Sequence, residues 1–410
     1  MSITAHSIQE AAKRISSEVV RSDLTLNERL SAIYGANVFL KKEHQQKVRS
    51  YKIRGALNFM SMLTDEEKER GVVCASAGNH SQGFAYSTNH FGINGVVFMP
   101  ANTPPQKQMK TLEFGNGRVQ IILSGPDFDT ANESAIKYAQ ENSMVMVPPF
   151  DDERIMAGQG TVGLEIMSQY GELAGRYGSL DAIIVPIGGG GLISGIAAYV
   201  KETNPQVRIV GVETQGAPAM YRSLQAGHPV TLETIDTLVS GMAVKSPGRL
   251  TYEMTSRYVG LENMMLVKEG EVCKELVDYF NHEGEVVELA GVASIAALGH
   301  LDIKGKNVVC VISGGNSDFG SYTDVEKRAL RHQHLLGYFQ IDIPDVPKAL
   351  EQVLECRAVD TNMIRMNYEP EIDPRAMVAF SFPSQQRFDE FVEGLEKLGW
   401  SYQIMGNGSK

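Results

Sequence analysis

Short apolar runs rich in β-branched residues recur along most of the chain, and segments with the spacing of amphipathic helices separate them. Several runs are apolar at every position instead of alternating with polar residues, which is typical of strands that are covered on both faces. We therefore predict an α/β fold with a mainly parallel sheet. The expected strands are NVFL (37–40), VVCAS (72–76), GVVFMP (95–100), RVQIIL (118–123), DAIIVPI (181–187), VRIVGVE (207–213) and NVVCVIS (307–313).

The pattern changes after about residue 325. Segments then follow in the order strand, helix, strand, strand, helix, strand, which is the order of a ferredoxin-like unit. We accordingly expect a catalytic body over 1–325, with a smaller subdomain at about 53–155 inserted in it, a charged helical linker at 326–335 and a ferredoxin-like domain over 336–410. The six C-terminal segments are 337–343, 346–357, 361–369, 376–383, 385–399 and 401–405.

Composition places the chain among ordinary globular proteins, with 43% hydrophobic and 21% charged residues. The net charge of −11 comes without a stripe dense in Lys or Arg, so nucleic acid is not an expected partner. The first twenty residues have the spacing of an amphipathic helix, and no apolar stretch is long enough to span a bilayer. The scattered cysteines indicate reduced thiols in a cytoplasmic protein and have no metal-ligand spacing. They are Cys74, Cys273, Cys310 and Cys356.

In α/β folds ligands bind beyond the carboxyl ends of strands, so site residues are expected in the segments that follow the predicted strands. The run SYKIRGA (50–56) places Lys52 directly before a helix with apolar residues at Ile53 and Leu57. A lysine that forms a Schiff base has to be partly desolvated, so that its amine is neutral and free to attack. Taken alone, Lys52 is better explained as an ordinary surface lysine.

Two further segments combine small residues with hydroxyl or amide groups. SAGNHSQ (76–82) opens a helix, and its N–H donors would seat a carboxylate, although an ordinary N-cap explains the same residues. His80 by itself fits a structural role. In SGGN (313–316) the glycines allow close approach of a ligand and Ser313 could bond a ring nitrogen, but a turn capped by serine is the plain alternative.

The fourth segment has four consecutive glycines at the end of a predicted strand, namely Gly188, Gly189, Gly190 and Gly191, followed by Leu192. Glycines let backbone amides converge on a phosphate at a helix N-terminus, and few structural turns need four of them. A plain tight turn is one alternative. A dinucleotide site is another, because Glu213 ends the next strand, but the glycines lack the G-x-G-x-x-G register.

In this order and spacing, the four segments resemble those of threonine dehydratase among the fold-type II enzymes that use pyridoxal phosphate (PLP). GQGT (158–161) and GVE (211–213) extend the resemblance over nearly the whole chain. The C-terminal unit resembles the single ACT-like regulatory domain of the short biosynthetic form. The resemblance implies a lyase that converts L-threonine to 2-oxobutyrate and ammonia, the entry to isoleucine synthesis, and that assembles as a homotetramer.

The resemblance also implies roles for residues. Lys52 would carry PLP as a Schiff base, and its freed amine would take the Cα proton. Asn79 would bond the ring hydroxyl and Ser313 the pyridine nitrogen. The phosphate would lie on the amides of Gly188 to Gly191 and Leu192. The substrate carboxylate would lie on Ser76, Ala77, Gly78, Asn79 and His80.

The chain departs from the family pattern in places. It has Glu288 to Val292 where the family has Glu-Pro-Ala-Gly-Ala, and Ser240 where the family has an acid before Gly-x-Ala, which leaves the preference between threonine and serine open. Ala217 and Ala219 follow Glu213 in place of the carboxylates of metal-binding serine racemases, so no divalent metal site is expected. Lys348 stands where the family has a glycine, which leaves feedback by isoleucine or valine open.

Other functions remain as alternatives. A serine dehydratase, a serine racemase or a β-replacement synthase would keep the fold and the cofactor. A non-catalytic amino-acid sensor would bind without turnover. A nucleotide-dependent oxidoreductase would leave Lys52 and Ser313 without roles.

Overall fold

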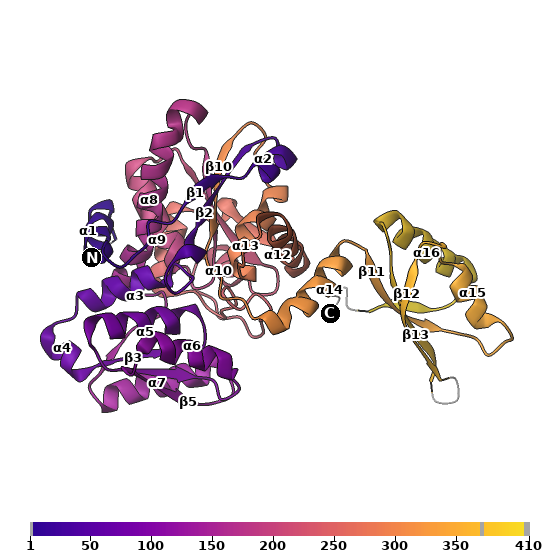
Figure 1. The fold of residues 1–410 in the computed structure, drawn as a ribbon, viewed down its shortest axis with the longest axis horizontal. Helices are drawn as coiled ribbons and strands as arrows, with labels where there is room; N and C mark the ends of the chain where they lie inside the picture. Colours follow the sequence, from indigo (N-terminus) through magenta and orange to yellow (C-terminus); the bar gives the residue numbers. More distant parts are fainter. Residues whose placement is uncertain (1–2, 370–372, 406–410) are drawn as a thin grey trace. The chain divides into compact units, whose positions relative to one another are not determined.

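The structure is a computed structural model that describes residues 3–369 and 373–405 of the chain. The chain divides into two compact units, shown in Figure 1. The first unit comprises Met1–Val272 and Glu283–Ser317, and the second comprises Cys273–His282 and Asp318–Lys410. The ranges expected from the sequence differ at the edges, because they place residues 273–282 and 318–325 with the catalytic body.

The larger sheet of the first unit has the strand order β1-β2-β10-β7-β8-β9, and only the β1–β2 pair is antiparallel. Four of its strands were predicted from continuous apolar runs. The strands are β1 (Leu24–Leu26), β2 (Asn37–Lys42), β7 (Ala182–Pro186), β8 (Arg208–Thr214), β9 (Met264–Val267) and β10 (Asn307–Ile312).

The smaller sheet is fully parallel, with the order β5-β4-β3-β6. Its strands are β3 (Val72–Ala75), β4 (Gly95–Met99), β5 (Val119–Leu123) and β6 (Val145–Met146). All seven strands expected between residues 37 and 313 are therefore confirmed, as is the mainly parallel α/β class. The sequence did not predict β1, β6 and β9, which have only two to four residues each.

Helices cover both faces of the central strands. Every residue of β7 and β10 is buried. On one face Ile183 and Val185 pack with Val162 of α8 and Ile196 of α9, and α13 packs on the other face. This double cover explains why the strands are apolar at every position. The helices that lie wholly in the first unit are α1 (Ala5–Ile15), α2 (Glu28–Tyr34), α3 (Lys52–Ser61), α4 (Asp65–Arg70), α5 (Asn79–Phe91), α6 (Pro105–Gly115), α7 (Phe128–Glu141), α8 (Glu153–Tyr177), α9 (Gly191–Thr203), α10 (Ala219–Ala226), α11 (Arg249–Tyr258) and α13 (Leu289–Ala296), with short 3-10 turns η1 (Glu43–Gln45), η2 (Leu261–Asn263) and η3 (Ala297–His300).

The second unit contains the predicted βαββαβ order on an antiparallel sheet of order β12-β13-β11-β14. Phe339, Phe380 and Phe391 lie in its core, where the ring of Phe391 contacts the rings of the other two. The ferredoxin-like prediction is confirmed. The elements are β11 (Leu336–Asp342), α15 (Ala349–Glu355), β12 (Asn362–Glu369), β13 (Asp373–Ser381), α16 (Gln385–Leu398) and β14 (Tyr402–Ile404), preceded by η4 (Phe319–Ser321) and α14 (Tyr322–His332), while α12 (Glu269–Glu283) has residues in both units.

The cysteines and the lengths of the helices complete the description of the fold. None of the four cysteines, all of which the structure describes, forms a disulfide. Across residues 3–369 and 373–405, no helix combines the length and the apolar character needed to cross a membrane.

Candidate active site

Backbone pairing places Lys52 beside the segment that follows β10. The N–H of Tyr51 donates to the carbonyl of Ser313 at 3.2 Å, and the N–H of Gly315 donates to the carbonyl of Arg49 at 2.8 Å. The intervening Ser50 forms a β-bridge with Gly314. Two candidate segments that are about 260 residues apart in the sequence are thus brought together, and α3 begins at the lysine itself.

The amine of Lys52 lies in a partly buried position. Its Nζ donates a hydrogen bond to the carbonyl of Pro149 at 2.9 Å. Burial lowers the pKa of Lys52 from its usual 10.5 to about 8, and the carboxylate of Glu288 opposes part of this shift. Roughly one amine in ten is then neutral at pH 7, against about one in three thousand for a lysine of ordinary pKa. A lysine attacks a carbonyl carbon only as the neutral amine.

The segment after β3 forms a tight turn into α5. The N–H of Gly78 donates to Ser76 Oγ at 3.1 Å, and Ser81 Oγ donates to the carbonyl of Gly78 at 2.7 Å. Helix α5 begins at Asn79 with no side-chain cap. A Cβ placed on Gly78 would meet nothing within 4 Å, so there is space for a ligand at the start of this helix.

Asn79 lies in a chain of side-chain hydrogen bonds. Its Nδ2 donates to Glu288 Oε1 at 2.6 Å, and its Oδ1 accepts from Asn316 Nδ2 at 2.8 Å. Asn316 also donates to the carbonyl of Val48 at 2.8 Å. The three side chains come from the starts of α5 and α13 and from the segment after β10, so the amide of Asn79 is fixed in orientation.

Glu288 was not among the candidate site residues, although it belongs to this group. Its backbone N–H donates to the carbonyl of Gly314 at 3.1 Å, directly before α13. Burial raises the pKa of its carboxyl, and the hydrogen bond from Asn79 and the charge of Lys52 act against that rise. The sequence named Glu288 only within a segment that departs from the family pattern, and a single acidic residue is too common to mark a site.

His80 is held as a neutral side chain. Its Nε2 lies 3.0 Å from the carbonyl of Val147, so Nε2 carries the proton. Burial lowers the pKa of His80 to about 3, and the charge of Lys52 contributes to the same shift. The imidazole therefore stays uncharged at neutral pH.

The segment Gly188–Gly191, here called the glycine loop, connects β7 to α9. Gly190 has φ of 92°, in the left-handed region that favours glycine. A Cβ on Gly189 would collide with the ring of Phe150, and one on Gly191 would lie 3.0 Å from Phe150 Cβ. Thr251 Oγ1 fixes the loop by donating to the carbonyl of Gly189 at 2.6 Å. The loop is thus shaped by close contacts that side chains would prevent.

Ser313 is nearly buried at the end of β10, and its Oγ donates to the carbonyl of Ala290 at 3.2 Å. The segment around Ser240, which differs from the family pattern, lies close to Ala290 and to the glycine loop. A Cβ on Gly241 would lie 2.7 Å from Ala290 Cβ, and one on Gly188 would lie 3.2 Å from Met242 Cα. Both segments that depart from the family pattern therefore lie next to the glycine loop or to Ser313.

The carboxylate of Glu213 caps a helix in this structure. Its carboxylate accepts hydrogen bonds from the N–H groups of Met220 and Tyr221 at 2.8 and 2.7 Å, at the start of α10. Burial raises the pKa of Glu213 to about 8, and the two N–H groups oppose that shift. Among the residues that the structure describes, no three His, Cys, Asp or Glu side chains gather as metal ligands would.

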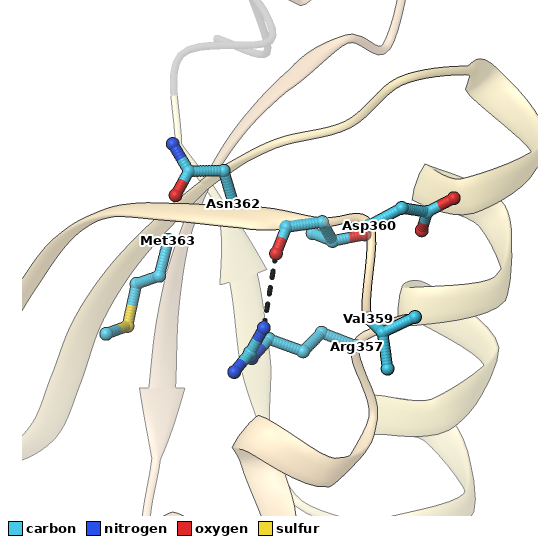
Figure 2. A pocket seen from close by; sticks show the side chains of 6 residues that line it. Arg357, Val359, Asp360, Asn362 and Met363 are labelled. Atoms are coloured by element: carbon cyan, nitrogen blue, oxygen red, sulfur yellow. Dashed lines mark hydrogen bonds between the residues drawn. The ribbon is translucent and has the colours of Figure 1, made fainter.

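A separate hollow of about 350 Å³ lies in the second unit, between the end of α15 and β12 (Figure 2). Arg357 Nη1 donates across it to the carbonyl of Thr361 at 3.2 Å. The hollow contains none of the residues that the sequence assigned to cofactor or substrate. Its lining is Arg357, Val359, Asp360, Thr361, Asn362 and Met363.

The residues of the first unit fit a PLP group. Its aldehyde needs a lysine whose amine is partly neutral near pH 7, and burial lowers the pKa of Lys52 to about 8. Its phosphate needs N–H groups at a helix start shaped by residues without Cβ, as the glycine loop is before α9. Its ring nitrogen needs a hydrogen-bonding side chain, and the hydroxyl of Ser313 lies in the segment paired with that of Lys52. Fold and site define a fold-type II PLP-dependent enzyme.

Comparison with known proteins agrees with this class. Residues 15–314 match the family described as pyridoxal-phosphate dependent enzyme. The chain is 40% identical to L-threonine dehydratase biosynthetic IlvA of Lactococcus lactis, over 99% of this chain and 98% of that protein. The structure of threonine deaminase isoform 2 from Solanum lycopersicum is similar with a TM-score of 0.72 and 33% identity, covering 80% of this chain and 95% of that one.

Maize serine racemase is also similar, with a TM-score of 0.73 and 30% identity over 82% of this chain and 100% of that one. The chain belongs to the pyridoxal-phosphate dependent enzymes and, within them, to the family of the biosynthetic threonine dehydratases.

Proposed function

We propose that the protein removes water and then ammonia from L-threonine, giving 2-oxobutyrate in the first step of isoleucine biosynthesis. The observation that carries the proposal is the placement of Lys52, whose amine has a pKa of about 8 and whose segment pairs with that of Ser313. The 40% identity to a biosynthetic threonine dehydratase over 99% of the chain supports threonine as the substrate.

PLP, when bound, withdraws electrons from the Cα of the amino acid and so makes its proton removable. Lys52 in its free amine form is the group that accepts this proton. A general base works best when its pKa is close to the working pH, and burial brings the pKa of Lys52 to about 8. The carbonyl of Pro149 holds the amine in place at 2.9 Å.

The start of α5 is the proposed seat of the substrate carboxylate. The first N–H groups of a helix lack partners within it and attract anions. Gly78 leaves space there, and the bond from Ser81 Oγ to its carbonyl fixes the turn. The neutral side chain of His80, bonded to Val147, contributes no charge to this seat, which therefore depends on the N–H groups of the turn.

The first test combines spectroscopy with product analysis. We would record the visible absorption of the purified protein before and after addition of L-threonine and assay 2-oxobutyrate. Lys52→Ala should lose the absorption band that borohydride fixes to the chain and should release no 2-oxo acid, whereas the exposed-lysine control Lys13→Ala should behave like the wild type. A colourless protein that remains inert when PLP is supplied would refute the proposal.

Serine is the second candidate substrate, because the chain departs from the family pattern at Ser240 and at Leu289, and maize serine racemase is similar in structure. The comparison to make is kcat/KM for L-threonine against L-serine, with chiral analysis of the serine that remains. Pyruvate formed faster than 2-oxobutyrate would assign a serine dehydratase, and D-serine would assign a racemase. Binding of either amino acid without any product would favour the sensor alternative.

We further propose that the second unit is an ACT-like regulatory domain that binds a branched-chain amino acid, in a cytoplasmic homotetramer. Its βαββαβ order and antiparallel sheet support this role. The test is to add saturating isoleucine or valine and to follow activity, melting temperature and mass by light scattering. If neither amino acid changes activity or melting temperature, the regulatory role is refuted, and a mass other than four chains refutes the tetramer.

A further inference from the structure

Helix α8 lies between the two helices that begin at the proposed cofactor-binding segments, and its run GQGT (158–161) contacts both. A Cβ placed on Gly158 would lie 2.6 Å from the Cα of Gly55 in α3. One placed on Gly195 in α9 would lie 2.5 Å from the N of Gly160. Backbones approach this closely only where side chains are missing. Because α3 begins at the cofactor lysine and α9 begins in the glycine loop, α8 sets the spacing between the two.

Gln159 holds the first turn of α3 by a hydrogen bond. Its side chain is 1% exposed, and its Oε1 accepts from the N–H of Gly55 at 3.1 Å. Gly55 lies three residues after Lys52. The N-cap residue of this helix, Tyr51, makes no side-chain capping bond. Gln159 therefore supplies from α8 an acceptor at the helix start, where N–H groups need partners.

Arg54 holds the same turn through its guanidinium, which makes a fork of paired hydrogen bonds to each of two carboxylates. Its side chain is only 1% exposed. Its guanidinium donates twice to Glu43, at 2.7 and 2.7 Å, and twice to Glu165 of α8, at 2.7 and 2.9 Å. It also donates to Thr161 Oγ1 of the GQGT run at 3.1 Å. Burial by itself would lower the pKa of Arg54, but the two carboxylates hold it above its ordinary value. Bidentate bonds of this kind fix direction as well as distance.

Lys41 supplies the second buried cation of this cluster. Its Nζ donates to Glu165 Oε2 at 2.6 Å, to Gln169 Oε1 at 2.9 Å and to the carbonyl of Ser22 at 2.8 Å. None of these three partners lies in α3. The two cations and the two carboxylates cancel in formal charge, so removal of either cation leaves one negative charge in excess inside the fold and destabilises it.

We infer that Arg54 and Gln159 are positioning residues, which hold the Nζ of Lys52 at the correct place relative to the glycine loop. The inference rests on the proposed use of PLP by this chain. The first turn of α3 has no side-chain cap of its own, and its direction is set by the fork of Arg54 and the amide of Gln159. Loosening either contact would displace the lysine from the bound cofactor without removing any group that touches it.

The experiment uses three variants of the full-length chain. Arg54→Lys keeps the positive charge but loses the fork, because an ammonium is a point donor. Gln159→Met keeps the volume of the side chain roughly constant and removes the acceptor of Gly55. Lys41→Met is the control, since it removes a buried charge from the same cluster while Lys41 itself bonds no residue of α3, although it shares Glu165 with Arg54. Should Arg54→Lys fail to fold, Gln159→Met tests the inference by itself.

Two readouts separate positioning from general damage. The first is the Kd of the apoenzyme for PLP together with the visible circular dichroism of the bound cofactor, and the second is the urea midpoint. We expect Arg54→Lys and Gln159→Met to raise the Kd about tenfold or more and to reduce the dichroism per bound cofactor, because a displacement of an ångström is costly in a site of this kind. Lys41→Met should lower the urea midpoint more than either of them and change the Kd less than threefold.

The outcomes are distinguishable. An unchanged Kd and dichroism in Arg54→Lys and Gln159→Met would overturn the inference. So would a Kd that rises in Lys41→Met as much as in Arg54→Lys at equal folded fraction, because the effect would then follow stability alone. If the wild type binds PLP but forms no 2-oxo acid, the proposed function fails while the positioning result still stands.

Discussion

The pKa of Lys52 leads to a quantitative prediction for the attachment of PLP to the apoenzyme. Only the neutral amine reacts, so the rate should follow its fraction. With a pKa of about 8, this fraction rises from roughly 0.1 at pH 7 to roughly 0.9 at pH 9 and then levels off. A lysine of ordinary pKa would gain about a hundredfold over the same interval and continue to rise. The expected result is an increase of about tenfold with a plateau.

The assay is stopped-flow absorbance of the apoenzyme mixed with PLP between pH 6 and 10, with Lys52→Ala as the blank. Glu288→Gln provides the internal check, because the carboxylate of Glu288 opposes the lowering of the pKa of Lys52. Without that charge the midpoint should move below that of the wild type, and the rate at pH 7 should increase. A hundredfold rise without a plateau, or a midpoint that moves upward in Glu288→Gln, would refute the reasoning.

Two further predictions concern backbone conformation. Gly189→Ala should raise the Kd for PLP at least tenfold, because the added Cβ would collide with the ring of Phe150. The control Gly175→Ala, on the exposed face of α8, should leave the Kd unchanged. Titration of both apoenzymes with PLP checks this, and equal Kd values would show that the loop tolerates a side chain. Lys348 has φ of 69° at the start of α15, so Lys348→Gly should relieve strain of about 1 kcal/mol and raise the melting temperature, and a lower melting temperature would contradict the strain.

The sequence by itself determined the strands that are apolar at every position and the glycine-rich segments at their ends. In β7 and β10 both faces are buried, so an apolar residue is needed at every position and the local sequence alone shows the strand. The C-terminal βαββαβ order was predicted for a similar reason, since its helices and strands differ in period. The short strands β1, β6 and β9 were missed because two to four residues are too few to show a period.

Only the tertiary structure decided which groups meet at the site. The bridge between Ser50 and Gly314 places Lys52 next to the segment of Ser313, and no local pattern records a pairing across about 260 residues. The same holds for Glu288, which reaches Asn79 from the start of another helix. Composition could not indicate the lowered pKa of Lys52, because burial causes it and burial depends on the packing of distant segments.

The GQGT run shows the same division. Its sequence indicated a resemblance and no role, whereas the structure places it between α3 and α9, where glycines permit backbone contact and Gln159 reaches Gly55. In the sequence, Arg54 and Glu43 look like ordinary charged surface residues, yet both side chains are buried and form an ion pair. Sequence patterns report the period and size of side chains, while the partner of a buried charge is set by which segments the fold brings into contact.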